Sequence, residues 1–549
     1  MRDRNRARPE SSPPWALLAI VPALVFVAYV RLHYADVPLE RDEGEYAYAG
    51  QLILKGIPPY ELAYNMKFPG TYYAYAVILA IFGQTPWGIH VGLMLVNAAT
   101  VFFVFAIGRR LLGDLAGAVA ATSFAVLSVD RWILGVFAHA THFVALAAMA
   151  GLLLLLRAIE SERRSTFFWS GVLLGLSVLM KQHAIFYLPF AAAFVYWSES
   201  RKEGHVFRAP AKKIGAMALG ALLPLALVVA VLSVQGVVGR FWFWTFQYAR
   251  EYVSEIRLAK ALPNLTTGFK VVTAANVELW VLGALGLFAL WIARWEPKSR
   301  VLVTGLLAAS FLAICPGFYF RGHYYILLLP AVALLGGVAV DSLRRILETR
   351  LSRRVAAGLA VAVFLAAVSS YVIRDREYLF AMNSRDLSRT LYGHNPFVEA
   401  VEIGKYIRER TDKNDRIAVL GSEPEIYFYA DRKAATGYIY TYALMEPQPY
   451  AATMQEEMIR EIESVHPRYL VFSWIDYSWM AQKESDQRII AWGNAYVGQC
   501  YDPVGVADIF SKDQSHVVWG DEVLKYEPVT PDLVYTFRRK SDGPCTASR

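Results

Sequence analysis

Residues 86–108 read PWGIHVGLMLVNAATVFFVFAIG, a run without a single Asp, Glu, Lys or Arg. A helix needs about 20 apolar residues to cross a hydrocarbon core of roughly 30 Å. Runs of about 16 to 24 residues with this character recur on both sides of it, all before position 374. The sequence therefore predicts a polytopic α-helical membrane protein that ends in a more polar segment.

The composition supports this class. Of 549 residues, 56% are hydrophobic and 19% are charged, against roughly 25% charged residues in an average soluble protein. This balance excludes a disordered chain, a disulfide-dense secreted module and a soluble cytosolic enzyme. The net charge of +8 comes from short basic clusters between the apolar runs, which is typical of membrane topology rather than of a nucleic-acid-binding face. We therefore expect no nucleic-acid partner.

The apolar runs predict about eleven membrane spans, and the basic residues indicate their direction. Lys and Arg are concentrated in alternate loops, as expected for cytoplasmic loops, if the arginine-rich N-terminus is also inside. The segment RLHYADVPLE after the first run offers no small-residue cleavage site, so we expect that span to be retained. The predicted spans are residues 15–30, 86–108, 115–130, 140–156, 167–180, 184–197, 214–234, 278–293, 301–315, 324–340 and 355–373.

This topology divides the chain into a transmembrane module, residues 1–373, and an extracytoplasmic C-terminal domain, residues 374–549. It predicts a multi-pass protein of the cytoplasmic (inner) membrane with its N-terminus in the cytoplasm. The first outer loop, residues 33–85, is long. Apolar residues at helical spacing in 42–55, and a second apolar stretch at 72–82, predict two helices that lie along the membrane surface.

The C-terminal segment predicts alternating helices and strands, and therefore a small α/β domain. Neither early strand is followed by GxGxxG, so a nucleotide site is not indicated. The cysteines lack metal-binding spacing. Cys500 and Cys545 could pair in an extracytoplasmic domain, which the sequence leaves open. The predicted helices are 397–410, 450–464 and 482–497, and the predicted strands are 416–421, 468–474 and 533–537.

The segment RDEGEYAYAG, residues 41–50, places the adjacent carboxylates Asp42 and Glu43 at the predicted outer surface. A carboxylate in this position could act as a general base on an acceptor hydroxyl or amine. Asp42 and Glu45 also have the spacing of a helix capping box, which would make Asp42 a structural residue. The residue types alone leave both interpretations open.

Two lysine-containing segments lie on the same predicted side of the membrane. In NMKFPG, residues 65–70, Lys67 could bind a phosphate as a point charge, or it could be a lysine whose long side chain reaches the membrane interface. Lys181 and Gln182 interrupt two spans at their outer end, where ionisable residues are functional candidates. The alternative for Lys181 is a plain charge at a helix end.

Histidines and an arginine complete the candidates. In FAHATHF, His139 and His142 share one helix face, but two histidines without a third ligand are a weak metal signal. The segment RGHYYILLLP places Arg321, His323 and Tyr324 at the outer start of a span, as phosphate ligands or as interface anchors. Each residue has a structural alternative. The topology nevertheless brings all of them to one side of the membrane.

This ordered set of motifs resembles the GT-C glycosyltransferases. It contains an Asp-Glu pair after the first span, a Lys-x-Pro in the same loop, a Lys-Gln at the outer end of span five, and HYY ahead of a proline in span ten. The chain is similar to the protein O-mannosyltransferase and aminoarabinose transferase group, including the Rgt-type bacterial sugar transferases. The segment GSEPEIYFYADRKAATGYIY, residues 421–440, looks like the soluble domain of the bacterial branch. The resemblance covers residues 36–440.

The resemblance implies an inverting glycosyltransferase that moves a sugar from a polyprenyl-phosphate donor to a lipid, glycan or protein acceptor at the outer face of the cytoplasmic membrane. Asp42 would be the catalytic base, and Glu43 would orient the acceptor or shape the site. The family often has an acidic residue at the outer start of span four, where this chain has Thr141. Because many members of the family need no metal, no metal or other cofactor is expected. The substrate-binding candidates, of which the basic ones would hold the donor phosphate, are Lys67, His142, Lys181, Gln182, Arg321, His323 and Tyr324.

A second interpretation is a transporter or flippase for polyprenyl phosphate or a lipid-linked sugar, and a third is a receptor or assembly scaffold built around the C-terminal domain. A transporter would more often carry ionisable residues and Gly or Pro breaks at mid-span, in corresponding positions of two halves. Here the polar residues gather at one face, and a scaffold would leave them without a role, which favours the transferase. The sequence leaves the donor sugar, the acceptor and the oligomeric state open.

Overall fold

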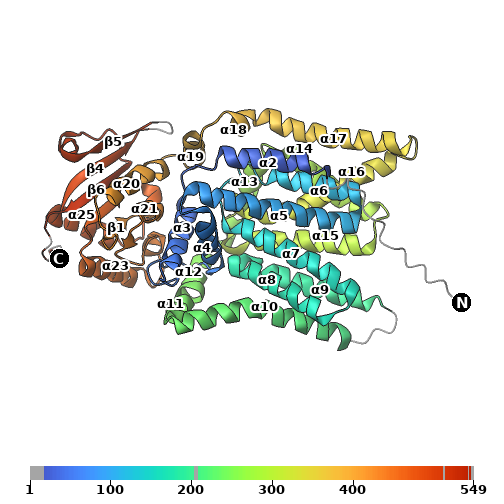
Figure 1. Ribbon diagram of the computed structural model, residues 1–549, viewed down its shortest axis with the longest axis horizontal. Helices are drawn as coiled ribbons and strands as arrows, with labels where there is room; N and C mark the ends of the chain where they lie inside the picture. The colour runs from blue at the N-terminus through green and yellow to red at the C-terminus, as the bar shows by residue number, and fades with distance from the viewer. Residues whose placement is uncertain (1–17, 203–207, 511–513, 542, 544, 546–549) are drawn as a thin grey trace.

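The computed structural model describes residues 18–202, 208–510, 514–541, 543 and 545. Long helices lie side by side in a bundle, and a domain built on a β-sheet packs against one end of that bundle (Figure 1). Two short helices of the first outer loop, α3 and α4, lie between the bundle and this domain. The site described below is at this junction.

Within the described residues, each of the eleven predicted apolar runs falls on a helix. Residues 15–17 of the first run lie outside the described residues. In the part of the chain that the structure describes, five helices are long and apolar enough to cross a membrane by themselves, or six if a pair bent by 115° counts as one span. The helices at the other predicted spans are too short or, in the case of α16, too highly charged to meet this criterion. The number of eleven membrane spans therefore stays a prediction. The five are α5 (Pro86–Leu112), α7 (Ala140–Ser161), α10 (Arg208–Val234), α15 (Pro297–Ile314) and α17 (Arg353–Arg374).

The residues at the two ends of α5 explain why this helix begins and ends where it does. The Thr85 hydroxyl accepts a hydrogen bond from the Gly88 amide at 3.1 Å, and Pro86 occupies the first helical position, where no amide donor is needed. Gly113 ends the helix with a φ of 99°, a conformation that favours glycine. The bundle is completed by α2 (Val21–His33), α6 (Asp114–Leu127), α8 (Arg164–Met180), α9 (Tyr187–Ser200), α14 (Val277–Ile292) and α16 (Leu329–Leu347).

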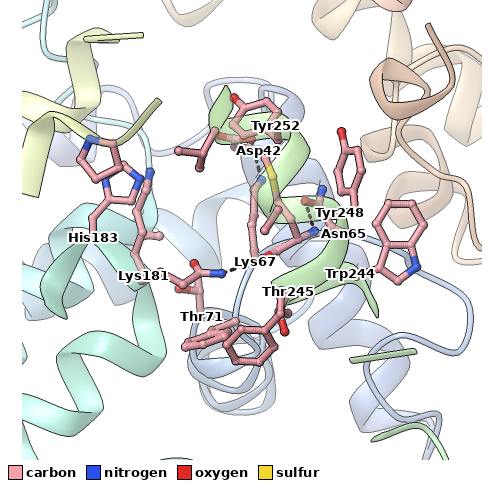
Figure 2. Close-up of a pocket in the computed structure, with 18 of the residues that line it drawn as sticks. Asp42, Asn65, Lys67, Thr71, Lys181, His183, Trp244, Thr245, Tyr248 and Tyr252 are labelled. Atoms are coloured by element: carbon pink, nitrogen blue, oxygen red, sulfur yellow. Dashed lines mark hydrogen bonds and ion pairs between the residues drawn. The ribbon is translucent and has the colours of Figure 1, made fainter. Parts of the chain in front are cut away.

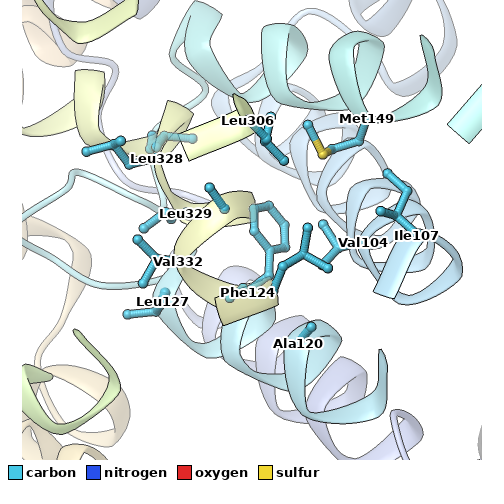
Figure 3. Close-up of a cluster of buried hydrophobic side chains, with 14 of the residues drawn as sticks. Val104, Ile107, Ala120, Phe124, Leu127, Met149, Leu306, Leu328, Leu329 and Val332 are labelled. Carbon is cyan, nitrogen blue, oxygen red and sulfur yellow. The ribbon is translucent and has the colours of Figure 1, made fainter. Parts of the chain in front are cut away.

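The centre of the bundle is aliphatic. Val104 and Ile107 of α5 pack with Phe124 of α6 and with Leu329 and Val332 of α16 (Figure 3). All five side chains are buried. Because lipid tails are as apolar as these residues, helices in a membrane associate mainly through close van der Waals packing of this kind.

The first outer loop forms α3 (Arg41–Leu54) and α4 (Gly70–Phe82). Both predicted helices are present, and their placement along the membrane surface stays a prediction. Helix α4 covers one side of α3 and the C-terminal domain covers another, so most residues of α3 are buried. Residues 235–277, which the predicted topology makes the second outer loop, contain α11 (Val238–Trp242), a π-helical turn (Phe243–Tyr248), α12 (Ala249–Ser254) and α13 (Ala261–Thr273).

The C-terminal domain is built on a six-stranded sheet in the order β2-β1-β3-β6-β4-β5. The first three strands are parallel to one another, and β6 and β4 pair antiparallel. The three predicted strands are confirmed as β1, β3 and β6. The strands are β1 (Arg416–Leu420), β2 (Lys433–Ala434), β3 (Tyr469–Ser473), β4 (Tyr501–Ile509), β5 (Ser515–Trp519) and β6 (Leu533–Arg539).

Helices cover this sheet, and two of the predicted ones have nearly the expected bounds. The third, expected from residue 482, begins only at Arg488. Strand β4 escaped prediction because Pro503 and Gly505 interrupt its pattern at a bulge. Cys500 and Cys545 form a disulfide. The helices are α18 (Arg376–Phe380), α19 (Ser384–Tyr392), α20 (Phe397–Glu409), α21 (Glu425–Ala430), α22 (Tyr442–Met445), α23 (Ala451–Val465), α24 (Asp476–Trp479) and α25 (Arg488–Cys500).

Candidate active site

The segment 41–50 begins helix α3, and Glu40 caps that helix. The Glu40 carboxylate accepts a hydrogen bond from the Glu43 amide at 2.9 Å. The interpretation of Asp42 as the capping residue is therefore wrong. Asp42 lies in the first turn, where the helix dipole stabilises its negative charge, and its side chain is available for contacts outside the helix.

Lys67, from the loop between α3 and α4, lies between two carboxylates. Its Nζ is 2.7 Å from Oδ1 of Asp42 and 2.6 Å from Oε2 of Glu45. Asn65 donates to the same Glu45 oxygen at 2.8 Å, so Glu45 holds this loop against α3. Burial alone would raise the pKa of Asp42, but the Lys67 ammonium holds it well below its usual value.

A cavity of about 570 Å³ opens beside Asp42 and Lys67 (Figure 2). Three parts of the chain line it: the loops at one end of the helix bundle, the aromatic segment 243–254, and the C-terminal domain. The structure thus brings together most of the residues that the sequence predicted for the site. Those on the cavity wall are Asp42, Lys67, Lys181, Gln182, Arg321, His323 and Tyr324.

Glu43 and His142, also predicted for the site, do not line this cavity. The Glu43 side chain is fully buried, lies 3.0 Å from Nε2 of His90 and accepts a hydrogen bond from the Ala138 amide. It therefore joins α3 to α5 and to the loop before α7. His142 is buried within α7. The structure places both residues behind the cavity wall, where neither reaches a molecule in the cavity.

Lys181 and Arg321 add two cations to the cavity wall. The Nζ of Lys181 lies 4.2 Å from the centroid of the Tyr324 ring, and the Arg321 guanidinium lies 5.1 Å from another tyrosine ring, both within cation–π range. Gln182 donates to a carbonyl of the loop that carries Lys67, at 2.7 Å. Lys67, Lys181 and Arg321 are three of the four Lys and Arg residues that line this cavity, Arg250 being the fourth. Such a group of cations suits an anionic group such as a phosphate.

The C-terminal domain contributes Tyr440, Tyr442 and Glu446 to the cavity wall, and the sequence did not predict them for the site. The Tyr440 hydroxyl lies 3.4 Å from Oδ1 of Asp42, although 398 positions separate the two residues. Burial raises the pKa of Glu446 to about 7. Tyr440 ends the segment 421–440 that carries the family resemblance, but no local pattern indicates its contact with Asp42.

Asp42, His139 and His323 form a group of potential metal ligands whose ligand atoms lie within 4.8 Å of one another. The two imidazole rings are stacked with centroids 4.1 Å apart. Ligand atoms about 2.0–2.1 Å from a tetrahedral zinc ion would lie about 3.3 Å from one another. Lys67 also already neutralises Asp42, at 2.7 Å. A cation held by these three residues would therefore have to compete with the Lys67 ammonium for the Asp42 carboxylate.

Comparisons with known proteins show what this chain is similar to. A family model described as dolichyl-phosphate-mannose-protein mannosyltransferase matches residues 67–233. The undecaprenyl phosphate-alpha-4-amino-4-deoxy-L-arabinose arabinosyl transferase of Pseudomonas paraeruginosa is 26% identical over 378 residues, which are 65% of this chain and 65% of that protein. The match thus spans just under two thirds of the length of this curated relative.

Solved structures show the same architecture. ArnT from Cupriavidus metallidurans bound to undecaprenyl phosphate matches with a TM-score of 0.55 and 17% identity, covering 84% of this chain and 93% of that one. The oligosaccharyltransferase of Archaeoglobus fulgidus, tethered with an acceptor peptide, matches with a TM-score of 0.57 and 13% identity, covering 93% and 74%. The chain has the fold of these two solved structures. The predicted GT-C resemblance is confirmed, and with it a multi-pass membrane protein.

The basic loops meet at the end of the bundle away from the cavity. Arg110 and Lys298 both pair with Glu160, the latter at 3.4 Å. Ala140, which lines the cavity, begins the same helix that carries Glu160. Twenty residues of α-helix extend about 30 Å. The bundle therefore separates the cavity from a basic end by about the thickness of a hydrocarbon core.

Proposed function

We propose that the protein is an inverting glycosyltransferase that moves a sugar from a polyprenyl-phosphate donor to a lipid, glycan or protein acceptor. The observation that carries this proposal is the cavity in which Asp42 lies with three cations, Lys67, Lys181 and Arg321. The names of the curated relative and of the ArnT structure both include undecaprenyl phosphate, which supports a donor of this class.

In the proposed reaction, an acceptor hydroxyl or amine attacks the anomeric carbon of the donor sugar. The new bond forms while the bond between that carbon and the phosphate oxygen breaks, and the acceptor proton passes to Asp42. Polyprenyl phosphate leaves with the bonding electrons, and the three cations offset its growing charge. A single displacement inverts the anomeric carbon. Asp42 alone supplies the base, in keeping with Glu43 facing away from the cavity.

Lys67 would link donor binding to the strength of the base. While Lys67 pairs with Asp42, the pKa of that carboxyl is low and it accepts protons poorly. A donor phosphate beside Lys67 would share the ammonium group, which raises the pKa of Asp42. Glu45, at 2.6 Å from Lys67, would keep the lysine in place during this exchange. Asp42 would therefore become an effective base only with donor in the site.

We place the cavity and the C-terminal domain at the outer face of the cytoplasmic membrane, with the N-terminus inside. The support is the cluster of basic loops around Glu160, at the opposite end of the bundle from the cavity. Loops rich in Lys and Arg remain in the cytoplasm. The polyprenyl chain of a donor would then lie in the outer leaflet, with its phosphate at the level of Lys67 and Lys181.

An assay for the release of free polyprenyl phosphate tests the proposed function. Purified protein should liberate free polyprenyl phosphate from at least one member of a panel of polyprenyl-phosphate sugars when membrane extract supplies the acceptor. The same protein should be reconstituted in liposomes and tested for movement of labelled lipid-linked sugar between leaflets. Movement without release would favour the transport interpretation over the transferase.

We also propose that transfer requires no metal ion, since Lys67 supplies positive charge at Asp42. Excess EDTA should therefore leave the release of polyprenyl phosphate unchanged. Activity that disappears in EDTA and returns with Zn²⁺ or Mn²⁺ would contradict this expectation. In that case His139→Ala, which removes one potential ligand, should lose the response to added metal.

The activity should depend on pH through Lys181. Burial lowers the pKa of Lys181 to about 7, an effect that Asp42 opposes and that Lys67 and Arg321 increase. Only the protonated lysine can hold a phosphate, so kcat/KM for the donor should fall as the pH rises, approaching about tenfold per unit above pH 8. Lys181→Arg should remove this decline because guanidinium stays charged. A wild-type profile that stays flat from pH 6 to 9 would contradict a role for Lys181 in donor binding.

A further inference from the structure

Helix α3 is attached along its length to the C-terminal domain. Gly44 lies directly against α21: a Cβ at this position would be 2.6 Å from the Glu425 amide nitrogen. One turn further on, the Tyr48 hydroxyl accepts a hydrogen bond from the Ala434 amide at 2.7 Å. A side chain at position 44 would force the two helices apart. The helix that carries Asp42 is therefore packed as a part of the C-terminal domain, although it belongs to the first outer loop.

Arg41, the first residue of α3, is fixed by that domain. Its Nε donates to the carbonyl of Ser422, and its Nη1 donates to the Tyr442 hydroxyl at 2.7 Å. Its Nη2 donates to Oδ1 of Asn395 at 2.9 Å and lies 3.3 Å from Oε1 of Glu423. All three nitrogens of the guanidinium thus have partners in the C-terminal domain.

The ion pair between Arg41 and Glu423 is buried, with side-chain exposures of 10% and 0%. A buried pair of this kind adds little net stability, but removing one partner is costly because the other charge is left without compensation. A planar guanidinium with several fixed donors also constrains direction, which a lysine ammonium does not. The contact therefore defines where the first turn of α3 lies.

Asp42 directly follows Arg41, so the contacts of Arg41 also fix the backbone from which the Asp42 carboxylate projects. The C-terminal domain reaches Asp42 a second time through the Tyr440 hydroxyl, at 3.4 Å. The ring of Tyr440 lies 5.6 Å from Nζ of Lys67. Asp42 is thus held by Lys67 on the side of the helix bundle, and by Arg41 and Tyr440 on the side of the domain.

We propose that Arg41 is a positioning residue that ties Asp42 to the C-terminal domain through Glu423, so that transfer takes place only while this domain is docked on α3. The inference rests on the proposed function, in which Asp42 is the base. A displacement of about 1 Å at a reacting group can cost about 10²-fold in rate. The C-terminal domain is then a part of the catalytic centre and not an appendage to it.

Two conservative variants test the positioning role. Arg41→Lys keeps the positive charge but loses the planar set of donors, and Glu423→Gln keeps the shape but removes the charge. Each should lower kcat, by about 10²-fold in Arg41→Lys, while the donor KM changes little because Lys67 and Lys181 are untouched. The matched control is Lys55→Ala. It removes an ion pair with Asp431 at the other end of the same interface, with exposures of 30% and 39%, and should keep the wild-type kcat.

Hydrogen exchange measured by mass spectrometry provides a readout that needs no transfer activity. Backbone amides in residues 41–46 should exchange faster in Arg41→Lys and Glu423→Gln than in the wild type and in Lys55→Ala. Unchanged exchange in both variants, or a wild-type kcat despite faster exchange, would overturn the positioning role. If the wild type transfers sugar from no donor, the proposed function fails. The exchange rates then still decide whether Arg41 fixes this end of α3.

Discussion

Replacing Asp42 by asparagine should lower the release of polyprenyl phosphate by about 10³-fold, within the range of about 10²–10⁴ that a general base contributes. Asparagine keeps the volume of aspartate but cannot take the acceptor proton. The fold should tolerate the change, because Glu40 and not Asp42 caps α3. Lys67 also keeps Glu45 as an anionic partner at 2.6 Å. The affinity for donor and the melting temperature should therefore remain near the wild-type values.

The matched control for this variant is Asp36→Asn. Asp36 is an exposed aspartate ahead of the same helix, so this change removes one carboxylate charge from the outer loop without touching the cavity, and its turnover should equal that of the wild type. The decisive comparison is turnover at saturating donor, measured with bound donor and thermal unfolding in the same preparations. Wild-type turnover in Asp42→Asn would exclude this residue as the base.

Replacing Lys67 by methionine should lower kcat/KM for the donor by at least about 10²-fold, since removing one preorganised group that stabilises developing charge typically costs about 10²–10³ in rate. Methionine has nearly the length of lysine but no charge. The change leaves Asp42 and Glu45 without the cation that lies 2.7 and 2.6 Å from them, and it removes one of three cations from the donor phosphate. The donor KM should rise and kcat should fall together, which separates this variant from Arg41→Lys.

Two further variants help to interpret the effect of Lys67→Met. Lys67→Arg retains the charge in a larger group and should recover part of the activity. Lys260→Met removes an exposed lysine from the second outer loop and should behave as the wild type, which controls for a general loss of positive charge. Binding of polyprenyl phosphate, followed by isothermal titration in detergent, gives the donor affinity directly. An unchanged affinity in Lys67→Met would remove Lys67 from the donor site.

The membrane module was predictable because hydropathy is a local property of the chain. Helices such as α5 and α7 follow their apolar runs closely. The number of complete spans stays a prediction, since runs such as the one that forms α8 give helices shorter than 18 residues. The burial of α3 could not be predicted either, because the partners that bury its polar first turn come from the C-terminal domain, hundreds of positions away.

The candidate site was predicted by topology more than by any single motif. Lys67, Lys181 and Arg321 belong to different loops, and only their shared side of the membrane brought them together. Glu43 was assigned to the site as the neighbour of Asp42, yet successive residues of an α-helix point about 100° apart, so the two carboxylates face different surroundings. Tyr440 is distant from Asp42 in the sequence but lies beside it in the structure, because its position depends on how the C-terminal domain docks.

The close approach at Gly44 has a consequence for protein engineering. A chimera made by joining residues 1–373 to the C-terminal domain of a relative would set a foreign surface against a helix that has no room for a single extra carbon atom. The natural module for such a graft includes residues 40–55 together with the C-terminal domain. Moving both as one cassette would carry the carboxylate and its supporting contacts into the new host, and would leave the lipid-facing helices to the recipient.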